Sequence, residues 1–131
     1  MPAPPREPIV VSAAVARRGE TVLVTRRLEG THLGGLWEFP GGKCEPGESH
    51  VDCLVREVRE ELGVGVRVGD CLLSTRHDYG VKLVELHFFD CVLDGEPMPL
   101  LGQEIRWVAR RDLAALEFPG ADAELIVLLS R

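Results

Sequence analysis

The sequence predicts an α/β domain in which helices pack against a mixed sheet. Two segments rich in β-branched residues open the chain, a stretch with helical periodicity follows, and further strand-like and helix-like segments come after it. Strands interleaved with two or three helices are typical of this fold class. The chain has 131 residues, a length that fits one domain around one hydrophobic core.

We expect residues 9–131 to form that single domain. The preceding residues 1–8, "MPAPPREP", are rich in proline and are predicted to form a flexible tail. Residues 9–16 and 21–28 are rich in β-branched side chains, and the "RRGE" between them is typical of a turn. These two segments are therefore predicted to pair as a β-hairpin.

A short strand, a loop and a helix are predicted next. "LWEF" at 36–39 indicates the strand, and "PGGKCEPGES" at 40–49 indicates the loop. Ser49 is a suitable N-cap for the helix, and Gly63 is a suitable stop. Apolar residues between them recur at three- and four-residue steps, which places them on one helical face. They are Val51, Leu54, Val55, Val58 and Leu62.

The last part of the chain is predicted to return to the sheet and then end in helices. Residues 81–93 alternate enough to form a strand with Val84, Leu86 and Phe88 on one face. The other predicted elements are a strand at 105–108 and helices at 110–116 and 121–130.

Charge, hydropathy and cysteine usage exclude several classes of function. The net charge of −6 argues against binding of a nucleic acid polymer, which needs a basic surface. No long apolar span is present, so we expect no membrane insertion. The four cysteines form no C-x-x-C pair, which favours reduced thiols in a cytoplasmic protein.

The predicted helix carries a cluster of like charges. Glu57, Glu60 and Glu61 lie three and four positions apart, where like charges cost about 0.2–0.5 kcal/mol per pair in an isolated helix. A solvated face neutralised by basic residues is one interpretation. The glycine-rich loop before the helix favours another, because bare backbone can approach a ligand closely and carboxylates are the ligands that Mg²⁺ prefers.

The same residues resemble a known family motif. Gly42, Glu48 and the run "REVREELGV" at 56–64 match the pattern G-x5-E-x7-R-E-U-x-E-E-x-G-U of the Nudix box without a mismatch, where U is aliphatic. The flanking "VTRR…LWEFPGGK" and "LEFPGADAELI" resemble the MutT-type branch of this family. The resemblance implies an α/β/α sandwich with a mixed sheet, in which the box forms a loop–helix–loop catalytic motif.

The resemblance also implies roles for the residues of the box. The metal ligands would be the Gly42 carbonyl and the carboxylates of Glu57, Glu60 and Glu61, with Mg²⁺ or alternatively Mn²⁺ as the ion. Residues implied in catalysis are Glu57, as general base, together with Glu60, Arg56 and Glu48. Arg56 and Glu48 would orient the glutamates, and the spacing from Arg56 to Glu60 permits an ion pair on a helix.

The implied reaction is hydrolysis of a (deoxy)nucleoside triphosphate, including oxidised ones such as 8-oxo-dGTP, to the monophosphate and pyrophosphate. One alternative is a Nudix enzyme for another nucleoside diphosphate derivative, such as a dinucleoside polyphosphate, to which Tyr79 is a weak pointer. Another is a non-catalytic nucleotide-binding module, which would predict a damaged box. The partner is a small nucleotide in each case, and the oligomeric state stays open.

Substrate contacts are expected outside the box, at Arg27, Glu38, Phe39 and Asp122. Two interpretations of Asp122 stand side by side: it reads the base, or it merely caps or begins the last helix. Members of the MutT branch often carry a further metal-binding carboxylate six residues before the tryptophan that Trp107 matches. Leu101 occupies that position here, and Glu104 would have to reach from a different place, so the number of metal ions stays open.

Overall fold

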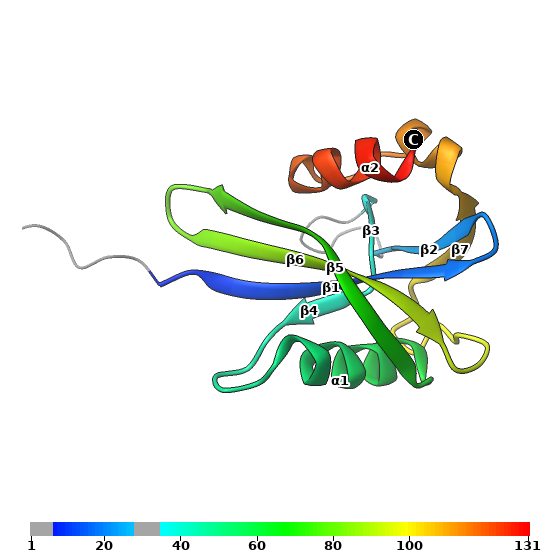
Figure 1. The fold of residues 1–131 in the computed structure, drawn as a ribbon, viewed down its shortest axis with the longest axis horizontal. Coiled ribbons are helices and arrows are strands. Elements are labelled where there is room, and N and C mark those ends of the chain that lie inside the picture. Colours follow the sequence, from blue (N-terminus) through cyan, green and yellow to red (C-terminus); the bar gives the residue numbers. More distant parts are fainter. Residues whose placement is uncertain (1–6, 28–34) are drawn as a thin grey trace, which may run out of the picture.

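The protein is described by a computed structural model that covers residues 7–27 and 35–131. The predicted α/β class and its layers are confirmed: a mixed sheet lies between one helix below it and the C-terminal helices above it (Figure 1). The strands are β1 (Ile9–Arg18), β2 (Thr21–Arg26), β3 (Trp37–Glu38), β4 (Gly41–Lys43), β5 (Val66–Asp78), β6 (Leu83–Leu93) and β7 (Glu104–Ala109). The helices are α1 (His50–Leu62), α2 (Ala123–Leu129) and the short 3₁₀ helices η1 (Arg110–Ala115) and η2 (Gly120–Asp122).

Strand β1 is the centre of the sheet, whose main order is β3-β2-β1-β6-β5. The predicted hairpin is present at its turn, where Arg17 and Arg18 of β1 pair antiparallel with the start of β2. Most of β1 instead pairs in parallel with β6 and antiparallel with β4. Residues 13–16 are buried on both faces of the sheet, which is typical of a central strand. Residue 28, the predicted end of the second strand, lies outside the described residues.

Sequence patterns did not predict strands β4 and β5. Strand β4 lies within the segment 40–49 that was predicted as a loop, and its pairing with β1 defines it. Strand β5 has no counterpart among the predicted elements. It pairs antiparallel with β6, and its register shifts between Val68 and Cys71 and again between Cys71 and Leu73. Only Val66 is buried among its residues, so neither an apolar run nor a clean alternation marks it. Backbone pairing along β6, rather than burial of side chains, defines this strand.

Both predicted caps of α1 are confirmed. The N-cap Ser49 hydroxyl accepts a hydrogen bond from the Asp52 backbone N–H at 3.0 Å. Gly63 follows the helix with a φ of 71°, a left-handed conformation that favours glycine, and its N–H donates to the Arg59 carbonyl. The helix therefore begins and ends where the sequence places it.

The buried face of α1 differs from the predicted stripe. Leu54, Val58 and Leu62 are fully buried as expected, but Val51 is 48% exposed and Val55 is 38% exposed. Cys53 is buried in their place. The helix is therefore turned so that the side carrying Cys53 faces the sheet. This rotation brings Glu57 and Glu61 toward the interior, whereas Glu60 stays exposed.

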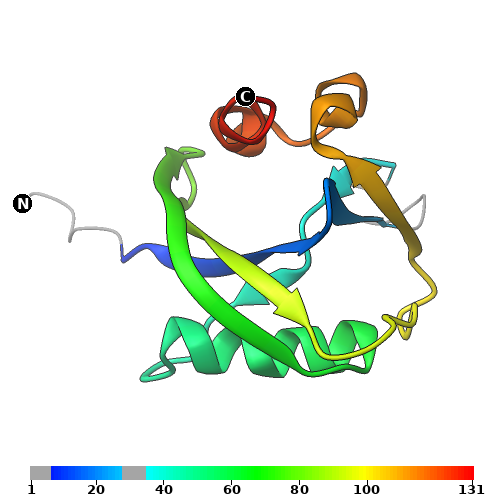
Figure 2. The same cartoon turned by 45° about the vertical axis from the view of Figure 1, so that its right-hand side comes forward.

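Helices α1 and α2 lie on opposite sides of the sheet (Figures 1 and 2). Apolar side chains form one cluster between the sheet and α1 and another between the sheet and α2. Val84, Leu86 and Phe88 share one face of β6, as predicted, although β6 starts at Leu83 rather than residue 81. The segment predicted as a helix at 110–116 is the 3₁₀ helix η1. The helix predicted at 121–130 is η2 running into α2, which ends at Leu129.

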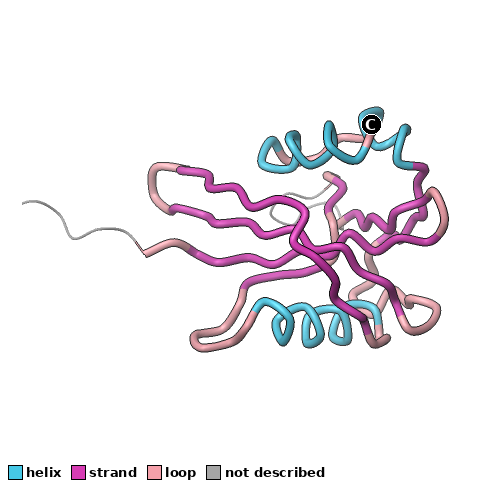
Figure 3. Tube along the Cα trace, viewed as in Figure 1, coloured by secondary structure: helices cyan, strands magenta, loops and turns pink. Residues whose placement is uncertain are grey.

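Loops connect α1 to its neighbouring strands on both sides, and a further loop joins β6 to β7 (Figure 3). Of the predicted tail, residues 1–8, the structure describes only residues 7 and 8. In the described ranges, no helix has the length and apolar character needed to span a membrane.

Candidate active site

A cavity of about 480 Å³ opens between α1, the sheet and the segment before β7. Its walls come from four parts of the chain that lie far apart in sequence. The lining residues are Thr25, Arg27, Glu38, Gly41, Gly42, Lys43, Glu57, Glu60, Glu61, Leu101 and Gln103. The three clustered glutamates therefore face a cavity rather than open solvent.

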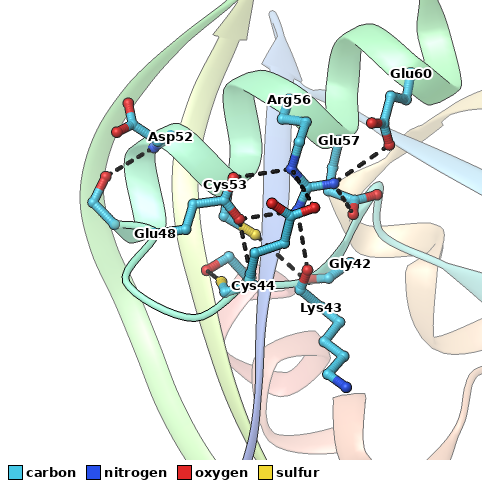
Figure 4. A network of polar contacts seen from close by, with 12 residues as sticks. Gly42, Lys43, Cys44, Glu48, Asp52, Cys53, Arg56, Glu57 and Glu60 are labelled. Carbon is cyan, nitrogen blue, oxygen red and sulfur yellow. Dashed lines mark hydrogen bonds and ion pairs between the residues drawn. The ribbon is translucent and has the colours of Figure 1, made fainter.

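Arg56 organises the carboxylates beside this cavity (Figure 4). Its guanidinium makes two hydrogen bonds to Glu48, each of 2.9 Å. A third donor reaches Glu57 Oε1 at 2.8 Å and Glu60 Oε2 at 3.4 Å. The remaining contact is with the Lys43 carbonyl oxygen at 3.1 Å, which joins the helix to the end of β4. The structure thus brings together the arginine and the three glutamates that the resemblance groups around it.

The Arg56–Glu48 pair is charged over the whole physiological range. Hydrogen bonds from Arg56 and then from the Glu45 backbone N–H lower the pKa of Glu48 to about 2. Hydrogen bonds to Glu48 and Glu57 raise the pKa of Arg56 further above its ordinary value. Paired donors on a planar guanidinium fix its orientation as well as its charge. Arg56 is therefore a rigid anchor for Glu57.

Glu61 has the opposite environment. Burial is the main cause that raises the pKa of its carboxyl to about 9, followed by the hydrogen-bonded carboxyl of Glu57 and the charge of Glu38. Glu61 Oε2 is buried and has no hydrogen-bond partner among the residues that the structure describes. A buried carboxylate needs a compensating positive charge, and a cation in the cavity would supply one.

Gly42 approaches Glu57 so closely that no side chain fits between them. A Cβ atom built on Gly42 would lie 2.6 Å from the carboxyl carbon of Glu57. The Gly42 carbonyl oxygen accepts a hydrogen bond from Cys53 Sγ at 3.5 Å, and burial raises the pKa of that thiol to about 12. Cys53 is thus a buried neutral packing residue, and the glycine leaves its backbone open to the carboxylate.

The donors present are carboxylates and a backbone carbonyl, which fit a hard divalent cation such as Mg²⁺. Within residues 7–27 and 35–131, no three His, Cys, Asp or Glu side chains converge closely enough to hold a metal ion as they stand. The carboxylates do not converge because two of the predicted ligands, Glu57 and Glu60, turn toward Arg56, and Glu60 is 58% exposed. Glu57 and Glu61 are already in contact, so Glu60 is the ligand that would have to turn inward.

The predicted substrate residues differ in how they meet the cavity. Arg27 and Glu38 line it and pair with each other, with Arg27 Nε at 3.0 and 3.1 Å from the two carboxyl oxygens. Phe39 is only 6% exposed, since it stacks on Phe118 and meets Phe88 edge-on. Its main contacts are therefore with the core, and its contact with a base stays a prediction.

Asp122 is buried, with 7% of its surface exposed, at the position just before α2. Its side chain makes no capping hydrogen bond to that helix, although Asp122 stands where α2 begins. Burial, and then the charge of Glu38, raise its pKa to about 7. Asp122 is not among the residues that line the cavity, so its contact with a base stays a prediction.

Leu101, at the position where the family resemblance implies a further metal-binding carboxylate, is 61% exposed and lines the cavity. Glu104 does not substitute for it, because its two oxygens accept hydrogen bonds from Arg26 at 2.5 Å and Arg106 at 2.9 Å. The sequence did not predict Thr25, Gly41, Lys43 and Gln103 as cavity residues. Gly41 and Lys43 flank Gly42 of the box, but nothing in the local sequence marks Thr25 and Gln103.

Comparisons with known proteins agree with this geometry. A family model described as the NUDIX domain matches residues 11–128. The CTP pyrophosphohydrolase of Escherichia coli (strain K12) is 35% identical over 121 residues, which cover 92% of this chain and 88% of that protein. The 8-oxo-dGTP diphosphatase of Haemophilus influenzae is 37% identical over 122 residues, which cover 90% of this chain and 88% of that protein. The solution structure of the E. coli ORF135 protein has a TM-score of 0.84 at 32% identity and covers 93% of this chain and 88% of that chain.

Proposed function

Because this chain belongs to the Nudix hydrolase family, we propose that it hydrolyses (deoxy)nucleoside triphosphates to the monophosphate and pyrophosphate. The observation that carries the proposal is the buried, partly unpaired carboxyl of Glu61 in contact with Glu57, at a cavity large enough for a nucleotide's phosphates. Relatives named a CTP pyrophosphohydrolase and an 8-oxo-dGTP diphosphatase support the same substrate class.

Divalent metal ions are general in this family, and we propose Mg²⁺, with Mn²⁺ as the alternative, held by Glu57, Glu60, Glu61 and the Gly42 carbonyl. Such an ion neutralises phosphate charge and lowers the pKa of a bound water. The oxygen donors at this cavity support that choice, and the raised pKa of Glu61 supports a site that awaits positive charge.

The chain's own residues would position and activate the reacting groups. Glu57 accepts the proton of the attacking water, and Arg56 holds its carboxylate in place through the 2.8 Å hydrogen bond. Glu48 in turn keeps Arg56 fixed by its paired contacts. Lys43 contributes a cationic side chain to the cavity wall, where substrate phosphates would enter.

We propose that Asp122 reads the base, which is supported by the charge of Glu38, a residue that lines the cavity and acts on the Asp122 carboxyl. An ionised carboxylate accepts hydrogen bonds only, so it suits an amino group, as on cytosine or adenine, or the N7–H of 8-oxoguanine. A protonated carboxyl can donate to a carbonyl oxygen instead. The buried carboxyl with a pKa of about 7 supports a role in either form.

A product assay with a nucleotide panel tests the proposal. Purified protein would be incubated with Mg²⁺ and dCTP, dATP, dGTP, 8-oxo-dGTP or a dinucleoside polyphosphate, and the products would be separated by chromatography. We expect monophosphate and pyrophosphate from a triphosphate, and no turnover in excess chelator. Turnover of only the dinucleoside polyphosphate would favour the alternative enzyme, whereas binding without any turnover would indicate a non-catalytic module.

We further propose that residues 9–131 act as one domain in the cytoplasm. The four cysteines support this location, because all of them are free thiols.

A further inference from the structure

The segment from Met98 to Gln103 crosses the C-terminal turn of α1. The Met98 backbone N–H donates to the Leu62 carbonyl at 2.9 Å, and the Leu100 N–H donates to the Glu61 carbonyl at 3.2 Å. The last carbonyls of a helix have no partner within the helix and need donors from elsewhere. This segment therefore supplies the missing donors to the turn of α1 that carries Glu61.

Gln103 adds a side-chain link at the same place. Its Nε2 donates to the Glu61 carbonyl at 3.0 Å, while its Oε1 accepts from the Leu101 backbone N–H at 2.9 Å. One carboxamide thus joins the backbone of the helix to the backbone of the segment. Gln103 and Leu101 also line the cavity, together with the Glu61 carboxyl group.

These contacts matter because its neighbours restrain only part of the Glu61 carboxyl. That carboxyl hydrogen-bonds to Glu57 and to the Gly41 backbone, but its Oε2 has no hydrogen-bond partner in the described part of the chain. The backbone that carries Glu61 therefore also sets the position of its carboxyl. Gln103 is the side chain that ties that backbone to the rest of the cavity wall. Metal ligands are oriented by such outer partners, and the loss of one typically weakens metal binding.

We propose that Gln103 is a positioning residue. It fixes the distance between Leu101 and the turn of α1 that carries Glu61, and the divalent metal site depends on this distance. The proposal rests on the metal site of the proposed function, but its own tests require no nucleotide. Gln103 touches neither the substrate nor the metal in this role. It acts through the Glu61 backbone.

A first experiment uses a property of the composition. Gln103 is the only glutamine and the chain contains no asparagine, so the protein has one carboxamide side chain. In a ¹⁵N correlation spectrum of the metal-free protein, its two NH₂ protons form a single unambiguous pair. We expect one proton to exchange slowly with water because it donates to the Glu61 carbonyl. Exchange of both protons at the rate of a free carboxamide would overturn the proposal.

A second experiment measures metal binding directly. Gln103→Met keeps an unbranched side chain of similar length without charge, but removes both hydrogen bonds. Titration with Mn²⁺ followed by electron paramagnetic resonance should show a dissociation constant raised about tenfold, the lower end of what loss of an outer partner costs. An unchanged dissociation constant would overturn the proposal.

Leu100→Ala is the matched control. It removes packing of the Leu100 side chain over Gly63 but keeps the carboxamide and its two bonds. Both variants would also be compared by thermal denaturation. If Leu100→Ala lowers the melting temperature as much as Gln103→Met but leaves Mn²⁺ affinity unchanged, the effect belongs to the carboxamide. Equal weakening of Mn²⁺ binding in both variants would reduce Gln103 to a general structural role and overturn the proposal.

Discussion

Gly42→Ala tests the close approach between Gly42 and Glu57, the proposed general base. The added Cβ would lie 2.6 Å from the Glu57 carboxyl carbon, whereas carbon atoms in contact prefer about 3.5–4.0 Å. The carboxylate must therefore retreat by about 1 Å, and a displacement of that size can cost about 10²-fold in rate. Glu57 cannot retreat freely, because Arg56 holds its Oε1 at 2.8 Å.

The fold should tolerate this change. The atom that the new methyl group meets is the end of a side chain, and Gly42 needs no left-handed backbone. Replacing glycine by alanine also reduces the entropy of the unfolded chain, which stabilises by about 0.4–1 kcal/mol where the conformation allows it. We therefore expect kcat/KM to fall about 10²-fold with a nearly unchanged melting temperature.

The assay is pyrophosphate release at saturating Mg²⁺, together with thermal denaturation of the same samples. Gly120→Ala is the matched control, because a Cβ there meets no atom within 4 Å. Gly41→Ala gives the contrasting case: φ is 148°, and its Cβ would collide with the Ser12 carbonyl oxygen, so that variant should lose stability. Near-normal turnover by Gly42→Ala would refute the reasoning that Glu57 must occupy its observed position.

Three further outcomes are expected. Glu57→Gln keeps the shape but loses basicity, so turnover should fall about 10²–10⁴-fold at saturating metal; near-normal rates would place the base elsewhere. Asp122 has its pKa raised from 3.8 to about 7, so the folded protein keeps a proton that the unfolded chain releases, and stability should fall as pH rises across that window. Over the same pH range, the ratio of kcat/KM for dCTP to kcat/KM for dGTP should rise with pH. Asp122→Asn should remove both the fall in stability and the rise in this ratio. If the ratio has the same pH profile in the wild type and in Asp122→Asn, this carboxyl does not read the base. Leu54→Ala removes a fully buried side chain under α1 and should cost about 2–5 kcal/mol by chemical denaturation; a loss well below that range would mean that the site collapses around the smaller side chain.

Local signals predicted α1 and its caps correctly, because a helix and its ends depend on residues a few positions apart. Ser49 and Gly63 both act as expected. The same local view failed for the face of α1, since Val51 and Val55 are exposed while Cys53 is buried. Periodicity shows which residues share a stripe, but the surface that the helix packs against determines its rotation. Strand β5 was missed for a related reason, as pairing with β6 defines it without burial of its side chains.

The sequence by itself determined the chemistry of the site. The box residues lie within 22 positions of one another from Gly42 to Gly63, on one loop and one helix, so their spacing already groups Glu57, Arg56 and the other carboxylates. Only the tertiary structure decided what meets them. Glu38 reaches Glu61 and Asp122 through its charge, and Gln103 reaches the Glu61 carbonyl across 42 positions of sequence. Such contacts arise when strands and helices pack together, and no spacing along the chain encodes them.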